Sequence, residues 1–213
     1  MCTVALFGLR NFAVGLAFTK TETVQVALFS LLVLGETVTR TGLFAILLGL
    51  AGVILISLKG RGAAAGLGPR AVALGLLGGA AFGGSAIGYR GAALTLGDAH
   101  FFFRAAFTLA AVTLLQTLVM ALWLRLAEPG QIARVFARWR VTALVGLTGM
   151  LGSLGWFTAF TLQNAAYVRA LGQVELIFGF LVTGLVFRER ITGREGLGIA
   201  LLGLSVVILV LHL

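Results

Sequence analysis

Two glutamates, Glu22 and Glu175, stand inside long apolar runs of this 213-residue sequence. Each lies about ten residues into its run, in TETVQVALF (21–29) and GQVELIFGF (172–180). At a rise of ~1.5 Å per helical residue, both carboxylates would reach the middle of a ~30 Å hydrocarbon layer. A charge at that depth costs roughly 2.5–3.5 kcal/mol to insert. Each glutamate is therefore expected to face the interior of a helix bundle, to pair with a cation or to keep its proton.

Helical spacing indicates which side chains accompany the glutamates. Glu175 shares a helix face with Gly172 and Gly179, whose missing side chains leave volume beside the carboxylate. Gln173 lines up with Arg169, one turn earlier. This pattern predicts a central polar cavity that binds a small-molecule solute. Its candidate residues are Glu22, Glu175, Arg169, Gln173 and Lys20, with Asn164, Tyr167 and Trp156 near its mouth.

A structural interpretation stays open beside the cavity. Lys20 is turned about 200° from Glu22 on a helix, so these two are not a natural pair within one helix. Glu22 or Glu175 could instead pair with Lys20 or Arg169 across two helices and hold those helices together. Glu36 and Glu189 lie in turns, where capping a helix or pairing with a nearby arginine is expected.

The remaining reactive side chains form no enzyme or metal constellation. Ser85, Ser153 and Ser205 have no histidine partner within reach, Cys2 is the single cysteine, and no phosphate-binding glycine loop is present. Two histidines are too few for a His-based metal cluster. The sequence therefore predicts no enzyme activity, no metal and no cofactor. ATP-driven transport would need a nucleotide-binding domain on another chain.

The composition places these residues in a lipid bilayer. Hydrophobic residues make up 60% of the chain and charged residues 11%, against roughly 45–50% and 25% in soluble domains. The net charge of +9 does not indicate a nucleic-acid partner, because the basic residues lie between the apolar runs, where they orient a membrane protein. We predict an all-α, multi-pass integral protein of the inner or plasma membrane. About seven transmembrane helices are expected, at roughly 12–34, 41–58, 71–92, 100–124, 141–161, 165–187 and 195–213.

An internal repeat relates the two glutamates. When the chain is shifted by 153 residues against itself, Asn11 falls on Asn164, Glu22 on Glu175 and Glu36 on Glu189. Acidic residues number only seven in the whole chain, so this alignment predicts a duplicated unit. The expected division is residues 1–58 for the end of the first copy, 59–70 for a connecting loop and 71–213 for a second copy of five helices. The first copy then lacks about three helices, and the chain is expected to be truncated at its N-terminus.

The ends of the two copies resemble the EamA-type members of the drug/metabolite transporter superfamily. The matching stretches are LLVLGETVTRTGLFAILLGLAGVILISL (31–58) and LVFRERITGREGLGIALLGLSVVILVL (185–211). The resemblance covers 9–213 and implies helices four to ten of a ten-helix fold made of two inverted five-helix repeats. It also implies secondary, proton-coupled export of a small organic metabolite or drug-like solute. Members often carry a proline early in helices four and nine; this chain has none there, so no particular substrate follows.

Two other functions compete with transport. The chain could be a non-transporting truncated remnant or membrane scaffold, which a stop codon upstream of its coding segment would favour. An intramembrane enzyme is disfavoured because no nucleophile and base occur together.

Overall fold

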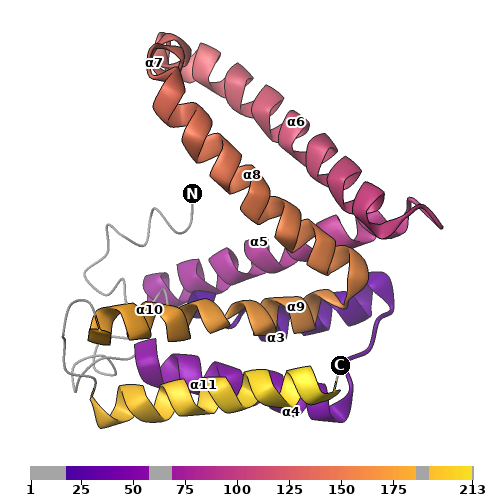
Figure 1. Ribbon diagram of the computed structural model, residues 1–213, viewed down its shortest axis with the longest axis vertical. Coiled ribbons are helices and arrows are strands. Elements are labelled where there is room, and N and C mark those ends of the chain that lie inside the picture. Colours follow the sequence, from indigo (N-terminus) through magenta and orange to yellow (C-terminus); the bar gives the residue numbers. More distant parts are fainter. Residues whose placement is uncertain (1–17, 58–68, 186–191, 213) are drawn as a thin grey trace. The chain divides into compact units, whose positions relative to one another are not determined.

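The computed structural model describes residues 18–57, 69–185 and 192–212, and every regular element in these ranges is a helix (Figure 1). Apolar runs without strand-like alternation account for this architecture. The elements are α3 (Glu22–Phe29), η1 (Ser30–Leu34), α4 (Arg40–Ser57), α5 (Pro69–Leu94), α6 (Phe101–Ala127), α7 (Gln131–Ala137), α8 (Trp139–Leu162), α9 (Ala165–Gly172), α10 (Val174–Leu185) and α11 (Gly193–His212).

Five of these helices are long and apolar enough to cross a membrane: α4, α5, α6, α8 and α11. They correspond to five of the seven predicted spans, so an all-α membrane protein is confirmed at this level. The predicted span at 165–187 is not one helix: Gln173 separates α9 from α10. The predicted span at 12–34 lies outside the described residues up to position 17, and a turn at Lys20 and Thr21 precedes α3 in the rest.

Both interruptions have the same local cause, a tightened helical turn. The Thr21 amide donates to Phe18 O at 3.1 Å, and the Gln173 amide donates to Ala170 O at 3.2 Å, so each bond spans three residues instead of four. The Thr21 hydroxyl also donates to Phe18 O, at 2.6 Å, and competes with the regular helix ladder.

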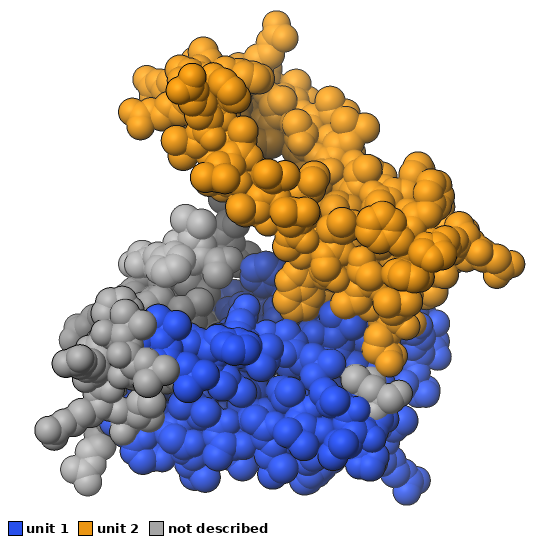
Figure 2. Space-filling view, viewed as in Figure 1, with its two compact units in different colours: residues 1–88, 164–213 blue, residues 89–163 orange. Residues whose placement is uncertain are grey.

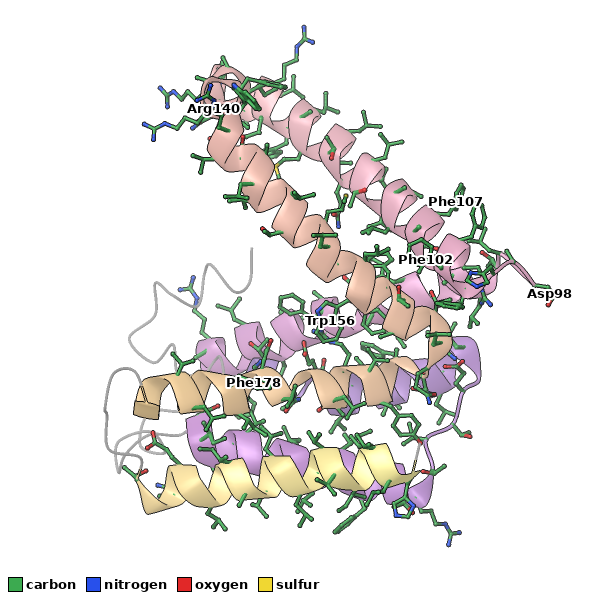
Figure 3. The ribbon with its side chains drawn as sticks, viewed as in Figure 1. Asp98, Phe102, Phe107, Arg140, Trp156 and Phe178 are labelled. Atoms are coloured by element: carbon green, nitrogen blue, oxygen red, sulfur yellow. The ribbon has the colours of Figure 1, made fainter. Side chains whose placement is uncertain are left out.

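The connection predicted at 125–140 contains a helix that the sequence analysis missed. Gly130, with a φ of +90°, ends the turn after α6, and α7 follows before α8 starts at Trp139. The positive φ suits glycine, which has no Cβ to clash. Figure 3 labels Arg140 at this end of the α6–α8 hairpin.

The chain divides into two compact units, residues 1–88 with 164–213 and residues 89–163 (Figure 2). The second unit contains the α6–α8 hairpin. Its small core joins Ala105 and Leu109 of α6 to Phe157 of α8, and Tyr89 stacks on Phe157 with ring centroids 4.5 Å apart. Arg90 is buried and its guanidinium donates to two carbonyls at the end of α8, Phe160 O at 2.7 Å and Gln163 O at 2.6 Å.

In the first unit, α4 packs tightly against α11 (Figure 1). A Cβ placed on Gly52 would lie 2.6 Å from Gly198 O, so only glycine allows this approach. Ser205 fills the neighbouring position and its hydroxyl donates to Ala45 O at 2.7 Å. Small residues are the usual means by which helices associate in lipid, where burial of apolar surface gives no drive.

A threonine directly precedes each of these two helices. Thr39 precedes α4 and its hydroxyl accepts from the Gly42 amide at 3.0 Å. Thr192 precedes α11 and forms a capping box with Glu195, whose carboxylate accepts from the Thr192 amide at 2.9 Å. Thr39 and Thr192 are 153 residues apart, the shift found in the sequence.

Candidate functional site

The buried face of α3 and of the residues on either side of it is mostly polar. Thr19, Glu22, Thr23 and Ser30 are buried there together with Val26, at helical spacing, while apolar side chains such as Leu32 stand on the outer surface. A soluble helix has the opposite distribution. The arrangement suits a helix with lipid on one side and a polar interior on the other.

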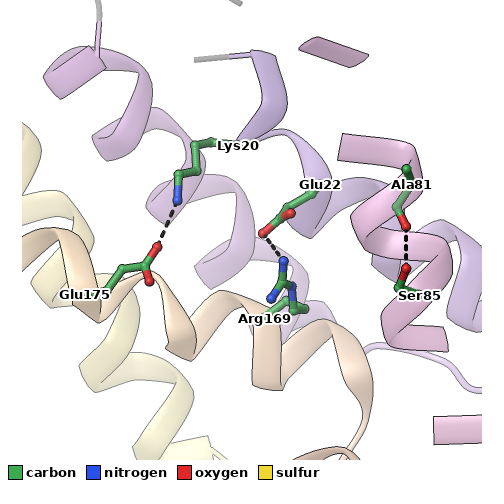
Figure 4. Close-up of polar contacts among 6 residues, drawn as sticks. All are labelled: Lys20, Glu22, Ala81, Ser85, Arg169 and Glu175. Carbon is green, nitrogen blue, oxygen red and sulfur yellow. Dashed lines mark hydrogen bonds and ion pairs between the residues drawn. The ribbon is translucent and has the colours of Figure 1, made fainter. Parts of the chain in front are cut away.

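Glu22 forms an ion pair with Arg169 of α9. A guanidinium nitrogen of Arg169, Nη2, lies 2.8 Å from Glu22 Oε1, and the side chains are 19% and 9% exposed respectively (Figure 4). Such a short, charge-assisted bond is the strong kind of hydrogen bond. Burial of both partners makes the pair sensitive to the loss of either one.

Glu175 forms the second ion pair, with Lys20. The ammonium nitrogen lies 3.0 Å from Glu175 Oε1, and the side chains are 27% and 63% exposed for Lys20 and Glu175 (Figure 4). Each segment therefore supplies one cation and one carboxylate to the other. This is the cross-helix pairing that the structural interpretation anticipated, and the four charges sum to zero.

Gln173 lies between the two ion pairs along the chain, at the break between α9 and α10. It is 4% exposed, and neither atom of its side-chain amide has a hydrogen-bond partner in the described part of the chain. The hydroxyl of Thr23, 1% exposed, is in the same condition. Most buried polar groups in proteins are hydrogen-bonded, so these two stand out.

Gly179, which was predicted to leave room beside Glu175, has open space around it, but this space is not shown to be a cavity. Among the described residues, no atom outside the local helix lies within 4 Å of a Cβ built on Gly179. Gly179 is itself on the exposed side of α10, so this space opens outward. The central cavity stays a prediction.

Three further predicted residues contact parts of the protein other than the ion pairs. Asn164 caps α9, because its side-chain oxygen accepts from the Ala166 amide at 2.8 Å. Tyr167 is buried, and its hydroxyl accepts from the Thr39 amide at 2.8 Å, just before α4. Trp156 is on α8, in the other compact unit, with its ring 5.8 Å from that of Phe160 (Figure 3).

Two polar residues of this region were missed in the sequence analysis. The buried hydroxyl of Ser30 lies 3.2 Å from Glu36 Oε2, to which it donates, and 3.4 Å from the side-chain oxygen of Asn164. Thr23 adjoins Glu22. Both occur on the helical face defined by Thr19 and Glu22, a spacing that was available in the sequence. The described residues contain no group of His, Cys, Asp and Glu side chains that could hold a metal ion.

Comparisons with protein-family models, curated proteins and solved structures gave no match to this chain.

Proposed function

We propose that the chain is a secondary transporter of the drug/metabolite type that moves a small organic solute outward across the inner membrane. Protons are the coupling ion in this proposal. The observation that carries it is the turn before α3 and the helix break between α9 and α10, whose flanking residues are joined by two ion pairs. Transporters made of repeats bind solute near the midplane, between discontinuous helices.

The spacing of the elements supports a duplicated architecture. Helices α4 and α11 begin at Arg40 and Gly193, which are 153 residues apart. The close contacts of α4 and α11 also exchange under this shift: Gly49 approaches Ser205, and Gly52 approaches Leu202, where Leu202 and Ser205 are the shift partners of Gly49 and Gly52. Contacts of this reciprocal kind occur where two equivalent surfaces meet about a two-fold axis. They favour the proposal of two inverted repeats, helices four to ten of a ten-helix fold.

The placement of charge supports a solute pathway at the same location. Intramembrane ionisable residues face a bundle interior or a wet cavity and mark ion or solute routes. Glycine packing, as at Gly52 and Gly198 between α4 and α11, joins helices through close backbone contact instead of through ion pairs. We therefore infer that the glutamates between α3 and α9–α10 serve transport in addition to packing.

Reconstitution tests the proposal directly. The purified chain is placed in liposomes loaded with a bacterial metabolite extract, a pH gradient is applied, and the loss of each solute is followed by mass spectrometry. We expect at least one organic solute to leave faster than from protein-free liposomes, and the difference to vanish when the gradient is collapsed. Folded protein that gives no solute a faster exit would refute transport and favour the scaffold.

A further inference from the structure

We propose that the transported solute is uncharged and that the side-chain amide of Gln173 is its main hydrogen-bonding partner. This inference rests on the proposed transport function and concerns the chemical class of the solute. It depends on two observations. The charged side chains between α3 and α9–α10 are already paired with one another, and the Gln173 side-chain amide has no hydrogen-bond partner among the described residues.

The first step concerns charge. Lys20 lies 3.0 Å from Glu175, and Arg169 lies 2.8 Å from Glu22, so two cations are paired with two carboxylates. An ionic solute bound beside the largely buried Glu22–Arg169 pair would bring a net charge into a poorly solvated site, or would have to displace one partner of an existing pair. A solute without net charge avoids both costs.

The second step concerns the amide itself. The Gln173 side chain offers two N–H donors and a carbonyl acceptor, and all of them are buried without a partner among the described residues. Leaving such groups unpaired opposes folding. A bound group that presents a donor beside an acceptor would satisfy both ends of the amide at once.

The third step concerns position. Gln173 follows Arg169 by one helical turn and precedes Glu175 by two residues, so it is flanked along the chain by the members of both ion pairs. It also occupies the tightened turn between α9 and α10. The geometry therefore points to carboxamides, lactams and imides as the class of solute.

Replacement of the amide separates binding from structure. Gln173→Met keeps the length of the side chain and removes the unpaired polar atoms. We expect the unfolding temperature in detergent, without solute, to rise by about 2–4 °C. Gln131→Met is the matched control, because the Gln131 amide is at the surface and donates to Glu128 Oε2 at 3.2 Å; its unfolding temperature should stay within about 1 °C of the wild type.

Matched probes test the charge of the solute. Nicotinamide and uracil are uncharged; nicotinate and orotate are the same rings carrying a carboxylate, and 1-methylnicotinamide carries a positive charge. We expect nicotinamide or uracil to raise the unfolding temperature of the wild-type chain and of Gln131→Met. We expect no such rise for Gln173→Met, and none with the three charged probes.

The proposal is overturned if Gln173→Met unfolds at a lower temperature than the wild type, since the amide would then have a structural partner. It is also overturned if the charged probes stabilise the chain as well as the uncharged ones, or if none of the five does. The efflux measurement with metabolite extract separates these failures from failure of transport. Efflux of ionic solutes would leave the transporter standing and remove only the uncharged class.

Discussion

Two helix crossings within one compact unit join the early part of the chain to its late part, through different kinds of side chain. In the polar crossing, residues 18–29 meet α9 and α10 through the Glu22–Arg169 and Lys20–Glu175 pairs. In the glycine crossing, α4 meets α11 through Gly52 and Gly198. Both crossings connect segments that the 153-residue shift of the sequence superimposes.

The two crossings differ in what they require: one needs only close packing, and the other places charged side chains between helices. Close packing of small residues joins helices in lipid without burying any charge. Burying ion pairs costs desolvation that their attraction only partly returns. If packing were the only requirement, the glycine solution would serve at both crossings. Helix packing alone therefore does not account for the charged side chains at the polar crossing.

The largest expected loss of stability comes from breaking the buried Glu22–Arg169 pair of the polar crossing. Glu22→Gln leaves the Arg169 guanidinium without its carboxylate in a site that is 19% exposed, and should lower the free energy of unfolding by about 3–5 kcal/mol. Thermal and denaturant unfolding in detergent measure this loss. In the double variant Glu22→Gln/Arg169→Met no uncompensated charge is left, and most of the loss should be recovered. A double variant as unstable as the single one would show that the pair is not the cause.

The next largest loss of stability is expected from a substitution in the glycine crossing. Gly52→Ala places a methyl group 2.6 Å from Gly198 O, a backbone atom that cannot move aside alone, and should destabilise the chain by about 1–3 kcal/mol. Gly149→Ala in α8 is the matched control, since in the described chain no atom beyond its own helix lies within 4 Å of the added carbon. It should be neutral or slightly stabilising, because alanine favours helix over glycine. Equal losses for the two variants would contradict the assigned contact.

The sequence was sufficient to predict much of this unit. Apolar runs indicated the long helices, and the 153-residue shift correctly related the starts of α4 and α11. The possible partners of Glu22 and Glu175 were also named, because only Lys20 and Arg169 place cations within the same apolar runs. Which carboxylate meets which cation depends on how two helices approach, and spacing along one chain does not contain that information.

Other features needed the structure for physical reasons. The break at Gln173 arises from three-residue hydrogen bonds that any sequence can form, and the preceding Gly172 was a weak signal for it. Gln173 is 4% exposed, and spacing along one helix does not show which of its faces another segment covers. The helix α7 is only seven residues long and stands in a connection that also contains Pro129 and Gly130, so this stretch resembled a loop.

A smaller loss of stability is expected from removing the N-terminal cap of α11, one of the two helices of the glycine crossing. Thr192→Ala removes one half of the capping box with Glu195 and should cost about 1 kcal/mol. Thr192→Ser keeps the hydroxyl and should retain most of the stability. Thr148→Ala in α8 is a control within a helix, where the hydroxyl merely donates to Leu144 O at 3.0 Å, and its effect should be a few tenths of a kcal/mol. Unfolding in detergent ranks the three variants, and a Thr192→Ala chain as stable as Thr192→Ser would remove the capping box from the account.

The smallest effect on stability comes from the second ion pair of the polar crossing. Glu175→Gln removes a carboxylate that is 63% exposed, and exposed pairs contribute about 0.2–1 kcal/mol. The proposed transport should nevertheless lose its dependence on the pH gradient, because the glutamine can neither take up nor release a proton. Lys20→Met removes the other half of the same pair, keeps the carboxylate and should keep the pH dependence. Unfolding temperature and efflux per folded molecule are measured on the same preparations. Glu175→Gln could instead destabilise the chain as much as Glu22→Gln and leave efflux per folded molecule unchanged. Both ion pairs would then serve only to hold helices together, as the glycines do, and the polar crossing would have no part in the proposed transport.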